Sequence, residues 1–220
     1  MTQSTSLTEE LQAFATARRA ARAPEANKIM DESTAALEQS GLLENALKVG
    51  QVAPDFSLPN VFGKRVQLSN LLQSGPVVLA FYRGAWCPYC NMQLRALQLA
   101  LPKFRALGAS LIAISPQQPD HALSLSEKHA LEYDVLFDAG NEVARAFGLA
   151  FTLPMALREL YEKMNINLPE QNGTDTWELP LAATYVIEPG FTVRLASVNA
   201  DYTRRLEPSE IVATLREWRG

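Results

Sequence analysis

Two cysteines three residues apart, Cys87 and Cys90, are the side chains best suited to covalent chemistry, and they are the only thiols among the 220 residues. They stand in the run Trp86-Cys87-Pro88-Tyr89-Cys90, directly after a predicted strand. A close pair at a strand end indicates thiol redox chemistry rather than a disulfide scaffold.

The position of the pair predicts which sulfur reacts. If a strand delivers Cys87 to the first turn of a helix, its sulfur lies over unpaired backbone N–H groups, where the helix dipole favours an anion. We therefore expect a lowered pKa and a nucleophilic thiolate at Cys87, with Cys90 one turn further on as the resolving thiol. Pro88 suits the first helical position, which makes no intrahelical use of its N–H. Gln93, on roughly the same side of the helix as Cys90, is expected to be a solvated helix residue, with a hydrogen bond to the substrate as the alternative.

Two other roles for the thiol pair stay open. A structural zinc site needs four nitrogen or sulfur ligands, and the chain adds only His121 and His129, which we otherwise expect on a helix surface. Inert core thiols are common, but they have no reason to favour the start of a helix.

Composition limits the classes of protein. A hydrophobic fraction of 47% suits one α/β domain with decorations, and a net charge of −4 without a basic cluster argues against a nucleic-acid partner. Residues 1–10 lack the pattern of a secretory signal, and no apolar stretch approaches a membrane span. With one close cysteine pair, a cytoplasmic location is expected. No Gly-rich phosphate loop is visible, so no nucleotide, flavin or metal cofactor is expected.

The elements that must position the thiols form a domain of residues 50–220 behind a helical extension of residues 1–49, which is broken near Pro24. Continuous apolar runs predict strands buried on both faces, and their alternation with helices implies parallel pairing. The irregular stretch 151–180 is interpreted as an insertion over the sheet. The expected helices are 7–22, 26–47, 88–107 with a kink or break at Pro102, 119–130, 141–147, 154–164 and 208–218, and the expected strands are 53–58, 66–68, 76–82, 110–115, 135–137, 183–188 and 192–198.

This order of elements, with the thiol pair after the first long strand, resembles the thioredoxin fold. Residues 52–58 resemble the "APDF" opening of the peroxiredoxin superfamily, also called the alkyl hydroperoxide reductase and thiol-specific antioxidant family. Residues 81–90, 179–188 and 201–205 resemble the "FYRGxWCPYC", "LPxPATYVID" and "DYTxR" elements of a peroxiredoxin-like branch. The resemblance covers residues 50–218 and implies a thioredoxin-like α/β fold with a central mixed sheet flanked by helices.

Three departures from the family pattern bear on the chemistry. Gly84, which is still expected to border the substrate, stands where typical peroxiredoxins carry a peroxide-orienting hydroxyl. Cys-Pro-Tyr-Cys is also the glutaredoxin pattern, and a tryptophan before the first cysteine is typical of thioredoxins. Ala182 stands where most of the branch carries a proline that faces the thiols, unless a shifted alignment gives that place to Pro180.

The resemblance implies a thiol-dependent peroxidase that acts on hydrogen peroxide or small organic hydroperoxides. Cys87 would be the peroxidatic cysteine and Cys90 the resolving one, with thioredoxin, glutaredoxin or glutathione as the reductant. A thioredoxin-like protein disulfide reductase and a non-enzymatic redox sensor, in which oxidation shifts how the N-terminal helices pack, remain alternatives. A homodimer is expected from the resemblance and from the amphipathic N-terminal helices.

Several residues near the thiols are candidates for supporting roles. Arg83, close to the end of the buried strand, is expected to stabilise the thiolate and the peroxide, or else to reach solvent or a carboxylate. Arg204 or Arg205 is the second candidate for a cationic role, and we favour Arg204. Trp86 and Tyr89 are expected to wall the site, although both side chains also suit an ordinary core.

Overall fold

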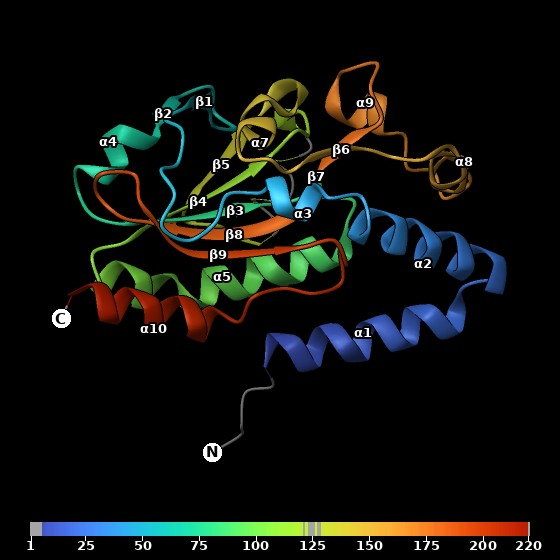
Figure 1. Ribbon diagram of the computed structural model, residues 1–220, viewed down its shortest axis with the longest axis horizontal. Helices are drawn as coiled ribbons and strands as arrows, with labels where there is room; N and C mark the ends of the chain where they lie inside the picture. Colours follow the sequence, from blue (N-terminus) through green and yellow to red (C-terminus); the bar gives the residue numbers. More distant parts are fainter. Residues whose placement is uncertain (1–5, 121, 123–125, 127–128, 220) are drawn as a thin grey trace.

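A five-stranded mixed sheet lies at the centre of the computed structural model, which describes residues 6–120, 122, 126 and 129–219 (Figure 1). The strands are β3 (Val77–Phe81), β4 (Ser110–Ser115), β5 (Asp134–Phe137), β8 (Ala182–Ile187) and β9 (Val193–Asn199). They lie in the order β5-β4-β3-β8-β9, with β3, β4 and β5 parallel and β8 antiparallel to both of its neighbours. This confirms the predicted mixed sheet and the parallel pairing within it.

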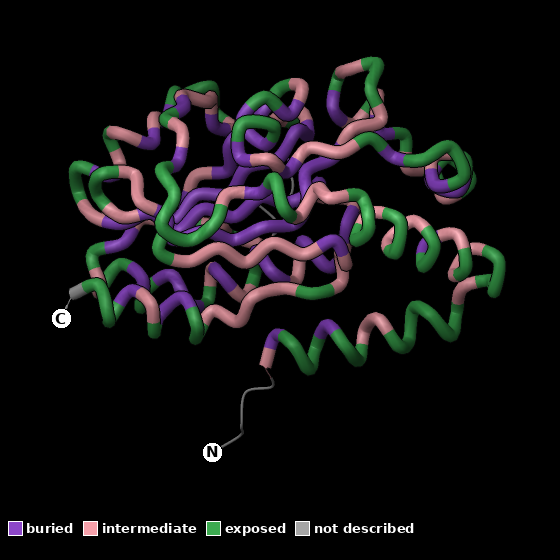
Figure 2. The backbone as a smooth tube through the Cα atoms, viewed as in Figure 1, coloured by how far each residue is buried: buried purple, intermediate pink, exposed green. Residues whose placement is uncertain are grey.

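Both faces of the sheet are covered, which is why its strands are continuous apolar runs (Figure 2). Along β3, Val78 and Ala80 face a core shared with the helices α5 (Pro88–Ala106) and α10 (Pro208–Arg219). Leu79, between them, faces the opposite core, because successive strand residues point to opposite faces. The second core is closed by α4 (Leu68–Leu72), α7 (Glu142–Ala146) and the hairpin of β1 (Ser57–Pro59) and β2 (Arg65–Gln67).

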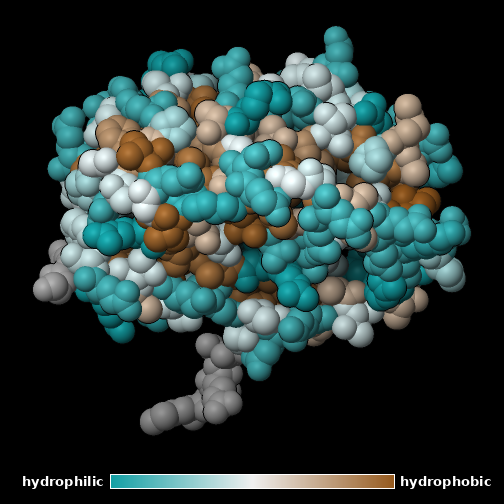
Figure 3. All heavy atoms as spheres, viewed as in Figure 1, coloured by the Kyte–Doolittle hydropathy of each residue, from teal (hydrophilic) through white to brown (hydrophobic). Residues whose placement is uncertain are grey.

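The N-terminal extension folds as the helices α1 (Leu7–Ala21) and α2 (Pro24–Glu38), followed by the short α3 (Leu42–Asn45). A capping box between Ser6 and Glu9 starts α1, which packs along α5. An ion pair of 2.7 Å between Arg19 and Asp31 joins α1 to α2. Hydrophilic residues cover the outer sides of both helices, so the extension presents its apolar side to the domain (Figure 3).

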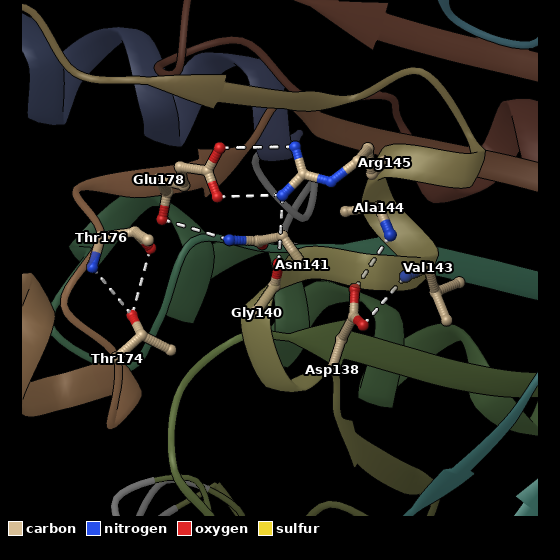
Figure 4. Close-up of polar contacts among 9 residues, drawn as sticks. All are labelled: Asp138, Gly140, Asn141, Val143, Ala144, Arg145, Thr174, Thr176 and Glu178. Atoms are coloured by element: carbon tan, nitrogen blue, oxygen red, sulfur yellow. Dashed lines mark hydrogen bonds and ion pairs between the residues drawn. The ribbon is translucent and has the colours of Figure 1, made fainter.

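The insertion comprises β6 (Ala150–Thr152), α8 (Met155–Lys163), α9 (Leu168–Asn172) and β7 (Glu178–Pro180). β6 and β7 pair with each other, and α8 packs against α2. The insertion is tied to the domain by an ion pair of 3.0 Å between Arg145 of α7 and Glu178 of β7 (Figure 4). Beneath it, the buried Asp138 accepts the N–H groups of Val143 and Ala144 and so fixes the start of α7.

Several expected boundaries are corrected. Pro102 does not interrupt α5, because its ring lies on the exposed side, where a carbonyl that loses its partner can turn to water. The helix expected over 26–47 ends at Glu38, and Gly41, at a φ of 77°, turns the chain into α3. Half of the helix expected over 119–130, including His121, lies outside the described residues. None of the helices in the described ranges is long and apolar enough to cross a bilayer.

Candidate active site

The thiol pair stands where β3 ends and α5 begins. Cys87 is the N-cap residue of α5 and Cys90 lies in its first turn. The backbone N–H of Cys87 donates to the carbonyl of Gly84 at 3.1 Å, which closes the turn between strand and helix. Both cysteines are free thiols, and their exposed fractions are only 2% for Cys87 and 0% for Cys90. A reaction partner must therefore reach them through the interior.

The two thiols share one negative charge. Burial alone would raise the pKa of Cys90, but the hydrogen bond from Cys87 and the positive charges of Arg205 and Arg83 outweigh it and lower the pKa of Cys90 to about 5. Burial raises the pKa of Cys87, and the hydrogen bond to Cys90 and the charge on that neighbour raise it further. These opposite pKa shifts favour a thiolate at Cys90 over one at Cys87 in the reduced site.

The direction of the Cys87 pKa shift is thus opposite to the lowered pKa that its place at the helix start led us to expect. The Cys87 side chain accepts no capping hydrogen bond from the helix N–H groups, so the helix start does not hold its charge. At Cys90, by contrast, the Arg205 Nη2 lies 3.4 Å from the sulfur. Because Cys87 donates its hydrogen to Cys90, the second cysteine is placed to act as the base for the first.

Arg83 is buried in a cage of aromatic rings. Its exposed fraction is 4%, and its Nη2 donates to the hydroxyl of Tyr161. The guanidinium carbon lies 4.6 Å from the centre of the Tyr202 ring and 4.9 Å from that of Trp86. Among the described residues, the Arg83 side chain neither reaches solvent nor forms an ion pair with a carboxylate. Burial alone would lower the pKa of Arg83, but Tyr161 and then the two cysteines outweigh it and raise that pKa above its ordinary value, so these groups offset the cost of burying the charge.

The second cation at the thiols is Arg205 and not the favoured Arg204. Arg204 is 75% exposed and its Nε lies 3.3 Å from the carboxylate of Asp201. The Arg205 guanidinium is instead held against Cys90 by the backbone carbonyls of Tyr202 and Arg204, at 2.6 and 2.7 Å. Sequence alone could not choose between two adjacent arginines, because neighbouring side chains in a loop point in different directions.

Other expected residues take defined places around the thiols. Trp86 and Tyr89 line the same cavity as Cys87. Gly84 has a φ of 149°, and a Cβ there would lie 2.4 Å from the Trp86 Nε1, so a larger residue does not fit without a shift. Gln93 is 1% exposed rather than solvated, and its Nε2 donates to the hydroxyl of Thr184 at 3.1 Å. The peptide bonds among the described residues are all trans.

A small cavity of about 70 Å³, called here the Cys87 slot, gives access to the first cysteine. Arg18 of α1 and Arg22, the residue directly after that helix, line it together with Arg83, and no carboxylate is among its described lining residues. An apolar cavity of about 230 Å³ lies between α2, α8 and the β6–β7 pair. The slot and the apolar cavity share as walls Met30, Arg83, Tyr161 and Tyr202.

Most of these walls escaped the sequence reading. Met30 and the α1 arginines come from the extension, and Tyr161 comes from the insertion. Their spacing is that of ordinary amphipathic helices, which carries no signal of a site. Tyr202 stands in the Asp-Tyr-Thr-Arg-Arg element, and Arg83 stands in the element of residues 81–90, but only Arg83 was named as a candidate.

A third cavity, called here the polar cavity, has a volume of about 490 Å³ and is lined by Arg205 and Gln93. Its other walls are α1, β8, β9 and the loop that leads to α10. No group of three or more His, Cys, Asp and Glu side chains within the described ranges could hold a metal ion. The arrangement as a whole is that of a buried dithiol with two cations and with cavities beside it.

Residues 49–196 match the sequence model of the AhpC/TSA family. Peroxiredoxin Bcp of Escherichia coli (strain K12) is 32% identical over 105 residues, which cover 48% of this chain and 67% of that protein. Thiol-disulfide oxidoreductase ResA of Bacillus cereus (strain ATCC 10987 / NRS 248) is 26% identical over 136 residues, which cover 61% and 76% of the two chains. The crystal structure of Peroxidoxin BcpB from Mycobacterium tuberculosis aligns with a TM-score of 0.63 and 26% identity, and covers 79% of this chain and 99% of that one.

Proposed function

The chain belongs to the AhpC/TSA family, and on that basis we propose that it is a thiol-dependent peroxidase in which Cys87 attacks the peroxide and Cys90 resolves the product. One observation carries the assignment of the two sulfurs. Cys87 lines a cavity, whereas Cys90 beside Arg205 holds the negative charge that can accept its proton.

The reaction steps follow from these different roles of Cys87 and Cys90. When a hydroperoxide enters the Cys87 slot, the Cys90 thiolate takes the proton of Cys87, and the new Cys87 thiolate attacks the terminal oxygen of the peroxide. The O–O bond breaks and Cys87 becomes a sulfenic acid. The leaving oxygen takes back the proton from Cys90 beside the positive charge of Arg83. The Cys90 thiolate then displaces hydroxide from the sulfenic acid and forms the Cys87–Cys90 disulfide, which a thiol reductant opens.

The apolar cavity bears on the choice of peroxide. It meets the Cys87 slot at the buried Arg83, so a hydroperoxide with an apolar body can place its reactive end beside Cys87 and its body among the side chains of α2 and α8. We include small organic hydroperoxides among the substrates for this reason. The absence of carboxylates from the described lining of the slot also suits a reaction that develops negative charge on oxygen.

A protein disulfide reductase would use the same two cysteines, and it is the weaker candidate. Such an enzyme must bring a disulfide of another protein against one of its sulfurs, and neither Cys87 nor Cys90 is exposed. A redox sensor needs only one oxidation without turnover. Turnover and substrate size therefore separate the three functions.

The test is steady-state consumption of hydrogen peroxide and of cumene hydroperoxide, with dithiothreitol as the electron source. We expect turnover by the natural protein, loss of the fast step in Cys87→Ser, and a single, slower oxidation without turnover in Cys90→Ser, which keeps the nucleophile but lacks its base. Insulin reduction, measured in parallel, should be slow. Full peroxidase activity in Cys87→Ser would overturn the proposal.

A cytoplasmic location and a homodimer complete the proposal. The location follows from a catalytic cysteine pair that must be kept reduced between turnovers. The dimer follows from the family resemblance, and sedimentation of the reduced protein measures it.

A further inference from the structure

The wall shared by the Cys87 slot and the apolar cavity carries one hydroxyl whose hydrogen is not in use. Three of the residues that line both cavities have hydrogen-bond donors, namely Arg83, Tyr161 and Tyr202. The Tyr202 hydroxyl donates to the sulfur of Met30 at 3.3 Å. The Tyr161 hydroxyl accepts a hydrogen bond from the Arg83 Nη2, and no described residue accepts its own hydrogen. Tyr161 can therefore donate to a molecule bound in the slot.

The Tyr161 hydroxyl is held in one place. Its side chain comes from α8 of the insertion, is 3% exposed and packs edge-on against Trp86, with ring centres 5.6 Å apart. Because Arg83 donates to the phenol oxygen, the phenol hydrogen must point away from the guanidinium. Burial raises the pKa of Tyr161, and the charge on Arg83 offsets this only in part. The group therefore stays protonated near neutral pH and acts as a donor.

The rest of the slot also lacks acceptors for its donors. The Arg83 Nε and the Trp86 Nε1 are buried and have no partner among the described residues. Every charged side chain in the described lining is an arginine, with Arg18 and Arg22 beside Arg83. Buried donors without partners are costly, so this lining favours a bound group that offers acceptors. An oxygen atom on which negative charge develops is such a group.

We propose that Tyr161 is a catalytic residue, which donates a hydrogen bond from its hydroxyl to the leaving oxygen of the hydroperoxide beside Arg83. This inference rests on the proposed function, because it adds a group to the oxidation step. The turn between β3 and α5 cannot supply this hydroxyl through Gly84, which has no side chain. A Cβ at Gly84 would lie 2.4 Å from the Trp86 Nε1, so the indole takes that space. The insertion thus completes the site.

The step is balanced without a further reactant. The Cys87 sulfur forms a bond to the terminal oxygen, the O–O bond breaks, and its electron pair moves to the leaving oxygen. The hydrogen bond from Tyr161 strengthens as this charge grows, so it stabilises the transition state more than the bound peroxide. The proton that neutralises the leaving oxygen comes from Cys90. Tyr161 keeps its hydrogen, and the products are the Cys87 sulfenic acid and water or an alcohol.

A purely structural role for the hydroxyl would act through Arg83. Burial raises the pKa of both thiols, and the charge on Arg83 acts in the opposite direction on each. If Tyr161 did no more than hold Arg83 in place, loss of its hydroxyl would weaken that effect and shift the thiol titration. A donor to the leaving oxygen leaves the titration unchanged. The pH dependence of the thiols therefore separates the two roles.

The experiment compares Tyr161→Phe, which keeps the ring against Trp86, with Tyr185→Phe as the matched control. The Tyr185 hydroxyl is also buried and has no partner, but it lies in the second core, away from the cavities at the thiols. Reduced full-length protein is mixed with hydrogen peroxide or cumene hydroperoxide, quenched with acid, and its remaining thiols are counted by mass spectrometry. Alkylation of Cys87 by iodoacetamide and thiolate absorbance near 240 nm against pH are measured on the same proteins.

We expect Tyr161→Phe to slow oxidation by both peroxides roughly 10- to 100-fold. Loss of an oxyanion-hole donor typically costs about 10²–10³-fold, and the loss is smaller here because Arg83 remains. Alkylation and the thiol titration should be unchanged, and Tyr185→Phe should match the natural protein in every measurement. Unchanged oxidation rates in Tyr161→Phe would overturn the inference. A loss confined to cumene hydroperoxide, a shifted titration, or an equal fall in alkylation would do the same.

The natural protein separates failure of this inference from failure of the proposed function. If both peroxides oxidise natural protein and Tyr161→Phe equally fast, the peroxidase function stands and the role of Tyr161 is refuted. If neither peroxide oxidises the natural protein, the proposed function itself is refuted, and the role of Tyr161 with it.

Discussion

At the scale of the residue, reactivity depends on how two sulfurs divide one charge. The negative charge is favoured at Cys90, where the Arg205 guanidinium contacts the sulfur. Cys87 retains its hydrogen and lines the Cys87 slot. A lone cysteine at a helix start would have to be ionised by the helix alone. Here the second thiol and the arginines do that work, so the pair acts as a nucleophile together with its own base.

Replacing Arg205 with glutamine should raise the pKa of Cys90. An opposite charge at this distance typically lowers an acid's pKa by about 1 to 3 pH units, so its loss should move the first thiol titration upward by a similar amount. Thiolate absorbance near 240 nm, followed against pH in the reduced protein, measures the change. The adjacent Arg204→Gln, whose side chain is 75% exposed, is the control and should titrate like the natural protein. If both variants titrated alike, Arg205 would have no part in holding the charge.

Gly84→Ala should destabilise the protein even though alanine is small. The residue has a φ of 149°, and its Cβ would lie 2.4 Å from the Trp86 Nε1, so backbone strain and a clash add to about 1–3 kcal/mol. Urea unfolding measures the loss. Gly190→Ala is the comparison, because its φ of 89° is also unfavourable but no atom lies within 4 Å of the new Cβ. An equal loss in the two variants would show that Trp86 is not in contact.

At the scale of the element, α1 closes the site that β3 and α5 build. Phe14 of α1 packs edge-on against Tyr89, with ring centres 5.3 Å apart, and Leu11 joins the core that contains both cysteines. Arg18 of the same helix and its C-cap residue Arg22 line the Cys87 slot. The helix that lies outside the family match therefore contributes walls to two of the cavities beside the thiols.

Phe14→Ala should loosen α1 and expose the thiols. The aromatic pair contributes about 0.5–1.5 kcal/mol, so its loss should raise the population of open states several-fold without unfolding the domain. The rate of alkylation of Cys87 by iodoacetamide should rise accordingly. Phe62→Ala, at a residue that is 77% exposed, removes the same ring without a packed partner and should leave the rate unchanged. Equal alkylation rates in the two variants would mean that α1 does not limit access.

Elements with strong local signals could be predicted from the sequence. β3, β4 and α5 were placed within about two residues, because each is a continuous apolar run or a capped amphipathic segment whose pattern depends on few distant contacts. The end of α2 and the course of α5 through Pro102 depend on neighbours in space. The thiol pair could be found because its spacing is itself the signal. Its charge could not be assigned, since Arg205 meets Cys90 only in the folded chain.

At the scale of the whole molecule, the buried charge ties folding to pH. The pKa of Cys90 falls from an ordinary 9.0 to about 5 on folding, so the folded reduced protein loses this proton at a lower pH than the unfolded chain does. Such a group contributes stability that is fully present above pH 9 and is lost as pH falls through 5. The pKa of Cys87 is raised on folding, so this thiol makes stability fall as pH rises, but only above pH 9.

Reduced natural protein should therefore gain stability over reduced Cys90→Ser as pH rises from 5 to 8.5. The measurement is the difference between their free energies of unfolding in urea, because titrating groups other than the two thiols cancel in the difference. We expect this difference to grow steadily over the interval. A difference that stayed flat or shrank with rising pH would mean that Cys90 is not ionised in the folded state.

The most direct test of the account is to ask which sulfur takes the oxygen. One equivalent of hydrogen peroxide is added to reduced Cys90→Ser and, separately, to reduced Cys87→Ser, and sulfenic acid is trapped with dimedone and located by peptide mass spectrometry. We predict labelling at Cys87 in the first variant, slower than oxidation of the natural protein because the base is lost, and little at Cys90 in the second, because only Cys87 lines the slot that peroxide can enter. Rapid labelling at Cys90 together with an unreactive Cys87 would contradict the account.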